Sequence, residues 1–460
     1  MKVLFVSLGC DKNLADSEAM LALLSDQGYE ITNDEEEAEV AVINTCCFIH
    51  DAKEESIQTI LELAEQKKTG RLQGIIVAGC LAERYQREIR EELPEADVLV
   101  GTASWEHIAE AVADAANGRR GQYFEPLEHL PDSQGRRQRS GIGFSSYLKI
   151  AEGCDKHCTY CVIPSVRGSY RSIPMERLMK EAEYLAGQGV KELLLVAQET
   201  TMYGVDLYGK KCLPELLRQL CRIPEFTWIR VLYCYPEEIT EELIQVMKEE
   251  EKICHYLDIP IQHASDTILK RMGRKTTKQE LTERILRLRR EIPDIVLRTT
   301  LITGFPGETE EEFAELFAFV DEMEFEHLGV FPYSLEEGTP AAKMDQQVPE
   351  EVKKERRDNI MALQQEITAM QAEERIGKEY QVLIEGLIPE EQQEGTPEEI
   401  ERLCEEEGDL YVGRSYLDAP EIDGYLFVRS RRALMSGDSV RVRVIGASEY
   451  DLYGELIEER

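Results

Sequence analysis

The sequence predicts an α/β protein of 460 residues in three parts: an N-terminal α/β layer domain, a central partial (β/α)6 barrel and a small C-terminal β-barrel. A chain of this length exceeds what one hydrophobic core supports. Short apolar runs alternate with amphipathic segments through the first two parts, which is typical of parallel sheets covered by helices. The last part carries short β-rich runs bounded by glycine and aspartate, which is typical of a small barrel.

We expect three domain boundaries. Residues from Arg119 to about Gly143 carry Gly, Pro, Ser and several arginines without periodicity, which indicates a linker. The expected ranges are 1–118 for the N-terminal domain, 119–143 for the linker, 144–374 for the central domain with a bracing helix, and 375–446 for the C-terminal barrel.

The N-terminal domain contains four strand-like runs, KVLFVSLGC, AEVAVINTC, GIIVAGC and ADVLVGT. Cys10, Cys46 and Cys80 each follow one of these strands by one to three residues. Open parallel sheets bind ligands at the carboxyl ends of their strands, so these three cysteines are candidates for one site.

The central domain contains six strand candidates separated by helical stretches, which predicts a parallel barrel or partial barrel with its active site at the strand carboxyl ends. These strands are expected at 147–151, 192–197, 228–232, 256–261, 296–302 and 328–333.

A helix is expected from Pro349 to about Arg375, because apolar residues recur there at intervals of three and four, and it should brace the barrel against the C-terminal part. The residues of this stripe are Ile360, Leu363, Ile367 and Met370. The β-rich runs YQVLIEG, DLYVGRSY, GYLFVR and SVRVRVIGAS follow, with an acidic insert from Pro389 to Asp409 in the first turn.

Composition constrains the class of protein and its partners. The sequence has no apolar run near the ~20 residues of a membrane helix, and we expect a cytoplasmic protein. Its twelve cysteines are then better explained by metal binding, catalysis or burial than by disulfides. The net charge of −37 disfavours nucleic acid and favours a basic partner, although acidity also serves solubility alone.

Cys154, Cys158 and Cys161 form a C-x3-C-x2-C motif directly after the first central strand. A compact loop with three thiolates can hold one iron–sulfur cluster and leaves one iron open. That iron can bind the amino and carboxylate groups of a substrate, whereas a zinc site closed by four cysteines has no such vacancy. A zinc site or three buried thiols is the alternative.

The motif CDKHCTYC resembles the cluster loop of radical S-adenosylmethionine enzymes. The resemblance extends over nearly the whole chain. SLGCDKN, INTCCFI and VAGCLAERY are similar to the three cysteine motifs of the methylthiotransferases, and AQETTMYG, IPIQHAS and TLITGFPGETEEEF are similar to their barrel motifs. The β-rich tail resembles their TRAM domain.

The resemblance implies two [4Fe-4S] clusters and S-adenosylmethionine as cofactors. Cys10, Cys46 and Cys80 would ligate one cluster, and the C-x3-C-x2-C motif would ligate the other. The expected cofactor-binding residues are Tyr160, Gln198, Glu199, Gly304, Gly307 and Glu308. The related pattern commonly has Asp where this chain has Glu199. Beyond the cluster ligands, no catalytic residue is identified.

Two further observations on these residues leave alternatives open. The TGFPGE segment that holds Gly304 and Gly307 is equally well explained as a turn that caps the next helix, and His263 is more often a structural histidine than a proton donor. Cysteines without an assigned role are Cys47, Cys212, Cys221, Cys234, Cys254 and Cys404.

The reaction implied by the family is insertion of sulfur and a methyl group at an unactivated C–H bond. Reductive cleavage of S-adenosylmethionine would give a 5'-deoxyadenosyl radical that abstracts the hydrogen, and the N-terminal cluster would carry the sulfur. An electron donor such as flavodoxin or ferredoxin is implied. Family members modify either an adenosine of transfer RNA or the β-carbon of an aspartate in small-subunit ribosomal protein 12.

The tail discriminates between these substrates. Residues 375–460 carry 10 Lys and Arg against 21 Asp and Glu, a net charge of −11, which is the opposite of an RNA-binding surface. The segment from Gly413 to Gly424 resembles the tail signature of the ribosomal-protein branch, although Asp418, Glu421 and Asp423 could simply line an exposed turn. We therefore expect ribosomal protein 12 or the ribosome as substrate.

Two alternatives remain. The nearer is a transfer-RNA adenosine methylthiotransferase, because a basic patch at Arg429, Arg431 and Arg432 would leave RNA contact open. The other is a non-catalytic iron–sulfur redox protein, which would not cleave S-adenosylmethionine.

Overall fold

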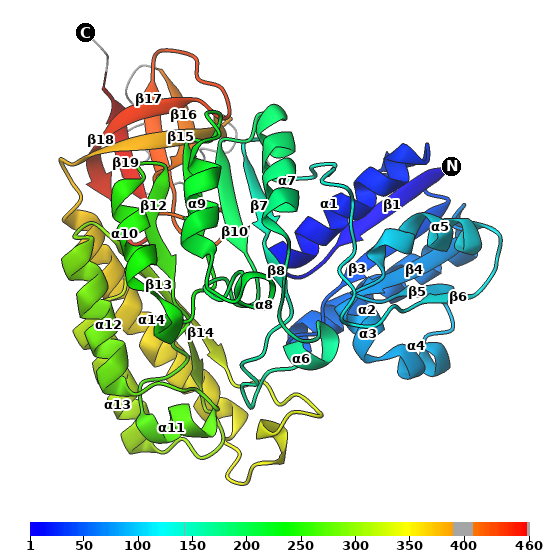
Figure 1. The fold of residues 1–460 in the computed structure, drawn as a ribbon, viewed down its shortest axis with the longest axis horizontal. Helices are drawn as coiled ribbons and strands as arrows, with labels where there is room; N and C mark the ends of the chain where they lie inside the picture. The colour runs from blue at the N-terminus through cyan, green and yellow to red at the C-terminus, as the bar shows by residue number, and fades with distance from the viewer. Residues whose placement is uncertain (142, 390–407, 458–460) are drawn as a thin grey trace.

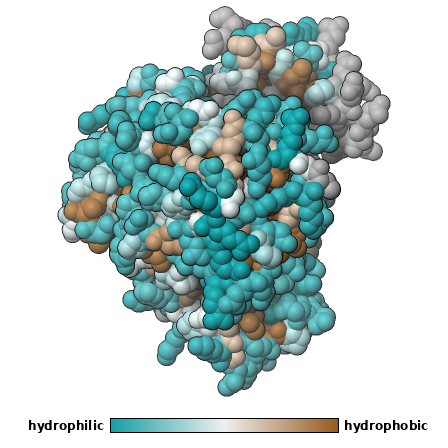
Figure 2. All heavy atoms as spheres, turned by 90° about the vertical axis from the view of Figure 1, so that its right-hand side faces the viewer, coloured by the Kyte–Doolittle hydropathy of each residue, from teal (hydrophilic) through white to brown (hydrophobic). Residues whose placement is uncertain are grey.

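The computed structural model describes residues 1–141, 143–389 and 408–457. Figure 1 shows an N-terminal sheet domain (blue to cyan), a central sheet domain (green to yellow) and a C-terminal barrel (orange to red). The face of the N-terminal domain in Figure 2 is mostly hydrophilic, as the 31% of charged residues suggests. Within the described residues, no helix combines the length and the apolar character needed to cross a membrane.

The N-terminal domain is a six-stranded, wholly parallel sheet. In spatial order its strands are β2 (Glu30–Thr32), β1 (Lys2–Ser7), β3 (Val40–Thr45), β4 (Gly74–Gly79), β5 (Val98–Val100) and β6 (Gly121–Tyr123). Residues of β3 and β4 are buried throughout, as expected for central strands covered on both faces. The main helices are α1 (Asp11–Asp26), α2 (His50–Thr69), α3 (Cys80–Arg84), α4 (Gln86–Glu92) and α5 (Ile108–Ala116).

The sheet extends past the expected boundary at Gly118. Strand β6 pairs with β5 and lies inside the segment 119–143 that the sequence indicated as a linker. Its sequence GQY is short and lacks apolar alternation, so no pattern indicates it. The short edge strand β2 was not predicted either, for the same reason.

The central domain confirms the prediction of a partial barrel. Its six strands are parallel and neighbour one another in chain order, without closing. They are β7 (Ser145–Lys149), β10 (Glu192–Val196), β11 (Trp228–Val231), β12 (Ile253–Asp258), β13 (Val296–Thr303) and β14 (His327–Pro332). A short antiparallel pair, β8 (Ala151–Glu152) and β9 (Arg171–Ser172), follows the first of them.

Helices cover the outer face of this sheet (Figure 1). The larger ones are α7 (Met175–Gly187), α9 (Leu213–Cys221), α10 (Glu241–Glu249), α12 (Lys278–Glu291) and α13 (Glu310–Met323). Capping boxes begin α12 at Thr277 and α13 at Thr309. In each box the threonine hydroxyl accepts from the backbone N–H of the glutamate three residues later, and the threonine N–H donates to that glutamate's carboxylate. Shorter helices at the domain's loops are α6 (Ile163–Val166), α8 (Val205–Tyr208) and α11 (Asp266–Arg271).

Helix α14 (Glu350–Glu373) contacts β13 and β14 of the sheet and β18 of the C-terminal barrel, so the bracing helix is confirmed. Its buried face differs from the predicted apolar stripe. Ile360 and Ile367 are buried, but Met370 is 44% exposed. Polar side chains such as Lys353 and Arg356 are buried instead, where they bond to strand ends and to Glu308.

The C-terminal domain is a closed five-stranded barrel in the order β15-β16-β17-β19-β18. Its strands are β15 (Glu379–Leu387), β16 (Asp409–Arg414), β17 (Leu426–Ser430), β18 (Ser439–Ala447) and β19 (Leu452–Leu456). The barrel therefore extends past the expected end at residue 446, because β19 is needed to close it between β17 and β18. Most of the acidic insert 389–409 lies outside the described residues.

The inner face of the central sheet is covered by this barrel. Leu194, Trp228 and Tyr256 of the sheet share one apolar core with Val382 and Leu426 of the barrel. The C-terminal domain therefore packs against the inner face of the sheet. The N-terminal domain lies at the carboxyl ends of the strands.

Candidate functional site

Cys10, Cys46 and Cys80 lie at one edge of the N-terminal sheet. Strands β1, β3 and β4 are direct neighbours, and each of the three cysteines follows one of them. Cys10 is the N-cap of α1, and Cys80 begins α3. A Cβ atom on Gly9 would lie 2.7 Å from Cys46 Cβ, so the loops that carry the first two cysteines are in contact. The structure brings together the triplet that the sequence predicted.

Asn13 fixes the spacing of these loops. Its side-chain Nδ2 donates to the carbonyls of Leu8 and Thr45, both at 3.0 Å, and thereby ties the ends of β1 and β3. The Sγ of the neighbouring Cys47 donates to the Cys80 carbonyl at 3.2 Å. That Cys47 is not a ligand stays a prediction.

Burial governs the ionisation of the thiols. It raises the pKa of Cys46, and it raises that of Cys80 to about 12 even though Arg167 opposes the rise. Metal ligands must be thiolates, so a metal centre would release these protons as it binds.

Cys154, Cys158 and Cys161 lie on a loop that the β8–β9 pair closes at its base. Gly153 precedes this loop with φ +78°, and a Cβ there would lie 2.2 Å from the Ser169 carbonyl oxygen. The Cys161 N–H donates to the Cys158 carbonyl at 3.0 Å, which holds the end of the motif in a tight turn.

Residues after the strands β11 and β12 surround this loop. Tyr235 places its hydroxyl 3.1 Å from Cys158 Sγ, and the Arg274 guanidinium stacks 4.0 Å from the centre of the Tyr235 ring. Tyr160 packs edge-on against Phe305 with ring centres 6.4 Å apart. Burial raises the pKa of the Cys154 thiol to about 11 and of the Cys161 thiol to about 12.

Gln198 and Glu199 follow β10, at the carboxyl edge where the sequence predicted them. Gln198 Nε2 donates to Glu152 Oε1 at 2.9 Å, and Glu199 Oε1 accepts from the Thr201 N–H at 3.0 Å. Gln198 Oε1 and Glu199 Oε2 are buried without a hydrogen-bond partner among the described residues. Burial raises the pKa of Glu199 to about 7. Within the described part of the chain, Gln198 Oε1 is free of hydrogen bonds and the nearest cation to Glu199 Oε2 is Lys156 Nζ at 3.9 Å, so both oxygens can accept from a polar ligand with N–H donors.

The TGFPGE segment has a local structural explanation. Gly304 has φ +69°, and a Cβ there would lie 2.2 Å from Lys353 Cγ, so glycine lets α14 approach β13. Glu308 accepts from the Gly304 N–H at 3.0 Å and pairs with Arg356 at 2.8 Å. The Gly307 N–H donates to the Gln346 carbonyl at 2.9 Å. Contact of Gly304, Gly307 and Glu308 with a cofactor stays a prediction.

His263 is fully buried, and its Nδ1 accepts from the Ser265 N–H at 2.9 Å. Its Nε2 is buried without a hydrogen bond to any described residue and lies 3.3 Å from Glu308 Oε2, so the structural role of His263 stays a prediction.

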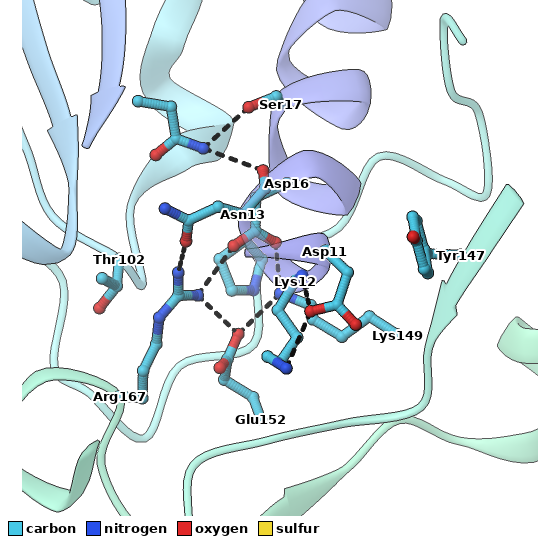
Figure 3. Close-up of polar contacts among 12 residues, drawn as sticks. Asp11, Lys12, Asn13, Asp16, Ser17, Thr102, Tyr147, Lys149, Glu152 and Arg167 are labelled. Carbon is cyan, nitrogen blue, oxygen red and sulfur yellow. Dashed lines mark hydrogen bonds and ion pairs between the residues drawn. The ribbon is translucent and has the colours of Figure 1, made fainter. Parts of the chain in front are cut away.

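A single segment joins the two cysteine triplets. The Gly168 carbonyl accepts from the Cys154 N–H at 3.1 Å, and the preceding Arg167 places its Nε 3.4 Å from Cys80 Sγ. Figure 3 shows the Arg167 side chain directed at the start of α1, toward Asn13 and Asp16, with Glu152 beside it. The two triplets are therefore connected through the short segment Arg167–Gly168.

The thiols of the two triplets are the donor type that iron–sulfur clusters take from a protein. Among the described residues, no three His, Cys, Asp or Glu side chains are arranged to hold one metal ion. A cluster makes a different demand, because each of its thiolates binds a different iron and the sulfur atoms stay apart. Thiols for a cluster and the buried acceptors Gln198 Oε1 and Glu199 Oε2, which make no hydrogen bond within the described ranges, are the chemical groups that a cluster and S-adenosylmethionine require.

The tail segment 413–424 docks the barrel on the central sheet. Arg414 pairs with Glu192 of β10 at 2.7 Å, and the side chain of Asp423, which is fully buried, pairs with Arg298 of β13 at 2.5 Å. Asp418 is 8% exposed, whereas Glu421 is exposed. The alternative of an exposed acidic turn is therefore wrong for two of the three acids.

Sequence reasoning missed the polar residues between the domains. Two of them stood beside recognised motifs, since Asn13 lies in SLGCDKN and Glu152 directly precedes Gly153 and Cys154. Arg167 and Lys149 carried no such signal, because their partner Asp16 is more than a hundred residues away in the chain.

Comparisons with known proteins agree with this architecture. Residues 2–101 match the uncharacterized protein family UPF0004, residues 148–320 match the radical SAM superfamily, and residues 398–457 match the TRAM domain. The solved structure of the radical S-adenosylmethionine methyltransferase TsrM from Kitasatospora setae, with cobalamin and a [4Fe-4S] cluster bound, has a TM-score of 0.55. At 18% identity over 74% of this chain and 76% of that one, it shows a shared fold.

Similar sequences are far closer. Ribosomal protein uS12 methylthiotransferase RimO of Lachnoclostridium phytofermentans is 57% identical over 99% of both chains. The protein of that name from Clostridioides difficile is 48% identical over 100% of this chain and 99% of its own. This chain therefore belongs to the RimO family of ribosomal protein uS12 methylthiotransferases, which are radical S-adenosylmethionine enzymes.

Proposed function

We propose that this chain adds a methylthio group to the β-carbon of an aspartate in small-subunit ribosomal protein uS12, with two [4Fe-4S] clusters and S-adenosylmethionine as cofactors. The observation that carries the proposal is the segment Arg167–Gly168, which contacts Cys80 of one triplet and Cys154 of the other. A sulfur-carrying site and a hydrogen-abstracting site would thus open on one substrate position.

The chain's own residues bind and orient the groups. Cys154, Cys158 and Cys161 would hold the cluster beside S-adenosylmethionine, which when bound supplies the chemistry that removes hydrogen from an unactivated carbon. Gln198 Oε1 and Glu199 Oε2 make no hydrogen bond to the residues that the structure describes and would accept from the ammonium of the methionine moiety, although Glu199 also lies 3.9 Å from Lys156 Nζ. Cys10, Cys46 and Cys80 would hold the second cluster in the N-terminal domain, beside Arg167.

A buried ion pair lies beside Cys10. Lys12 lies two residues after Cys10 and places its Nζ 3.3 Å from the centre of the Tyr233 ring, directly past β11. It also pairs with Asp11 at 2.9 Å. Because Asp11 matches the charge of the buried Lys12, the preference for a protein aspartate over an adenosine rests on the net charge of the chain and on similarity.

Charge and similarity support the same substrate. The net charge of −37 favours a basic ribosomal protein, and the relatives above are named for uS12. RNA contact at Arg431 and Arg432, which are exposed, stays open. The reaction requires an electron donor such as flavodoxin or ferredoxin, and a ribosomal substrate places the enzyme in the cytoplasm.

Anaerobic reconstitution followed by iron and sulfide counting tests the cofactors. We expect about eight irons in the unmodified chain and about four when Cys10, Cys46 and Cys80 are all replaced by alanine. The reduced unmodified protein should also cleave S-adenosylmethionine. About four irons in the unmodified chain would contradict the second cluster, and absence of cleavage would favour a non-catalytic redox protein.

A further inference from the structure

Arg167 is a buried arginine between the two cysteine triplets, and the chemistry proposed above does not require it. Its side chain is 2% exposed. One Nη atom lies 2.8 Å from Asp16 Oδ2 and 3.1 Å from Glu152 Oε2, and the other donates to Asn13 Oδ1. The guanidinium is thereby fixed from both domains (Figure 3).

The remaining donor of this guanidinium points at a thiol. Arg167 Nε lies 3.4 Å from Cys80 Sγ, within hydrogen-bond distance for sulfur. The backbone holds it there, because the Arg167 N–H donates to the Ile163 carbonyl at 2.8 Å and the Arg171 side chain donates to the Arg167 carbonyl at 3.1 Å. The contact is part of a rigid turn.

The charges around Arg167 are balanced as long as Cys80 is a neutral thiol. Lys149 contacts Asp16 and lies 2.6 Å from Glu152 Oε2, so two cations already match two carboxylates. A thiolate at Cys80 adds a negative charge that Arg167 faces directly at low dielectric. Hydrogen bonds and positive charge at a ligand sulfur stabilise the reduced, more negative state of an iron–sulfur cluster.

We propose that Arg167 is a positioning residue that holds Cys80 Sγ for the N-terminal cluster and raises the reduction potential of that cluster. This inference rests on the second cluster of the proposed function. Arg167 also connects the two domains. The guanidinium that orients Cys80 donates to Glu152, and Glu152 accepts from Gln198.

The test uses the full chain with Cys154→Ala, Cys158→Ala and Cys161→Ala, so that only the N-terminal cluster is present. After anaerobic reconstitution, a redox titration followed by electron paramagnetic resonance gives its reduction potential. We expect Arg167→Gln to shift the potential to more negative values. Arg167→Lys, which keeps a charge but cannot reach Cys80, Asn13 and both carboxylates together, should shift it in the same direction by less.

Arg84→Gln is the matched control. Arg84 also crosses between the domains, but it donates to the Cys47 carbonyl at 3.1 Å and pairs with Glu336 at 2.8 Å, and neither contact involves a predicted ligand sulfur. Its removal should leave the potential unchanged. A second control places Arg167→Gln in the chain with Cys10, Cys46 and Cys80 replaced by alanine, where the potential of the other cluster should move less.

An unchanged potential in Arg167→Gln, or an equal shift in Arg84→Gln, would overturn the inference. If Arg167→Gln assembles no cluster, Arg167→Lys decides, and a potential equal to or above that of the parent would overturn it. Failure of the proposed function gives a different result. The chain with Cys154→Ala, Cys158→Ala and Cys161→Ala, in which Arg167 is intact, would then bind no iron.

Discussion

Replacing Arg414 by methionine should loosen the C-terminal barrel from the central sheet. Arg414 of β16 is fully buried and donates to Glu192 of β10 at 2.7 Å and to Glu385 of β15 at 2.5 Å. Arg230 of β11 donates to the same Glu192 at 2.9 Å. The substitution keeps the apolar stem but leaves the buried Glu192 carboxylate with one cation.

The pKa of Glu192 gives the magnitude. Burial disfavours its carboxylate, but Arg414 and Arg230 outweigh that cost and lower the pKa of Glu192 from 4.5 to about 2. At about 1.4 kcal/mol per pKa unit, the lowering of the Glu192 pKa corresponds to about 3 kcal/mol of stability. Removing one partner of a buried ion pair typically costs a similar amount of stability. Because Arg230 remains, we expect Arg414→Met to cost about 2 kcal/mol, a factor of about 30 in the opening equilibrium.

The pH of the measurement follows from the sign of this change. The pKa of Glu192 is lower in the folded state, so its contribution is complete above about pH 4.5 and is lost as the pH falls toward 2. Hydrogen exchange near pH 7 therefore reports the full effect.

Hydrogen exchange of peptides from β16 measures opening of the barrel without requiring two-state unfolding of the whole chain. The control is Arg441→Met on β18, because the Arg441 side chain is 65% exposed and its pair with Glu379 should contribute about 0 to 1 kcal/mol. Equal exchange rates in the two variants would refute the assignment of Arg414 as the docking residue.

Three further results are expected. After reconstitution, Cys46→Ala should contain about four irons fewer than the unmodified chain, while Cys47→Ala should keep them all. Loss of iron in Cys47→Ala alone would instead identify Cys47 as the ligand. Gly153→Ala should lose the irons of the C-x3-C-x2-C motif, because φ is +78° and a Cβ would lie 2.2 Å from the Ser169 carbonyl oxygen, and full iron content would contradict this. Burial raises the pKa of Asp418 from 3.8 to about 6, so its cost grows as the pH rises through that range. Asp418→Asn should therefore stabilise the docked barrel at about pH 8 and not at about pH 4 in denaturant unfolding, and an equal gain at both would contradict the burial argument.

Much of the fold could be predicted because the buried strands are continuous apolar runs. All six residues of β3 and of β4 are buried, and each strand precedes a cysteine that the sequence motif also indicates. Strands that lie at edges or complete a barrel, such as β6 and β19, contain glycine and polar residues, and β19 is needed because it pairs with both β17 and β18. Tertiary pairing rather than local pattern determines them.

The candidate site divides in the same way. Cys154, Cys158 and Cys161 are close in sequence, so their spacing indicates one cluster. The other triplet converges only because β1, β3 and β4 are adjacent in the sheet, an order that periodicity does not give. The residues that join the two triplets, above all Arg167 and Asp16, are conspicuous only once both domains are folded together.

The docking role of the tail could not be predicted from its composition. Residues 375–460 have an acidic net charge. Asp418 and Asp423 nevertheless form no acidic surface, because their side chains are buried against His327 and Arg298. A count of charges does not distinguish paired buried acids from a solvent-exposed face.

Mass spectrometry of the modified product tests the account most directly. The reconstituted, reduced protein is incubated with S-adenosylmethionine and sulfide together with uS12, assembled ribosomes and transfer RNA in parallel. The account predicts the mass gain of one methylthio group on a single aspartate of uS12, free or in the ribosome, with transfer RNA unchanged. A methylthio group on a transfer-RNA adenosine, with uS12 unmodified in both forms, would contradict it.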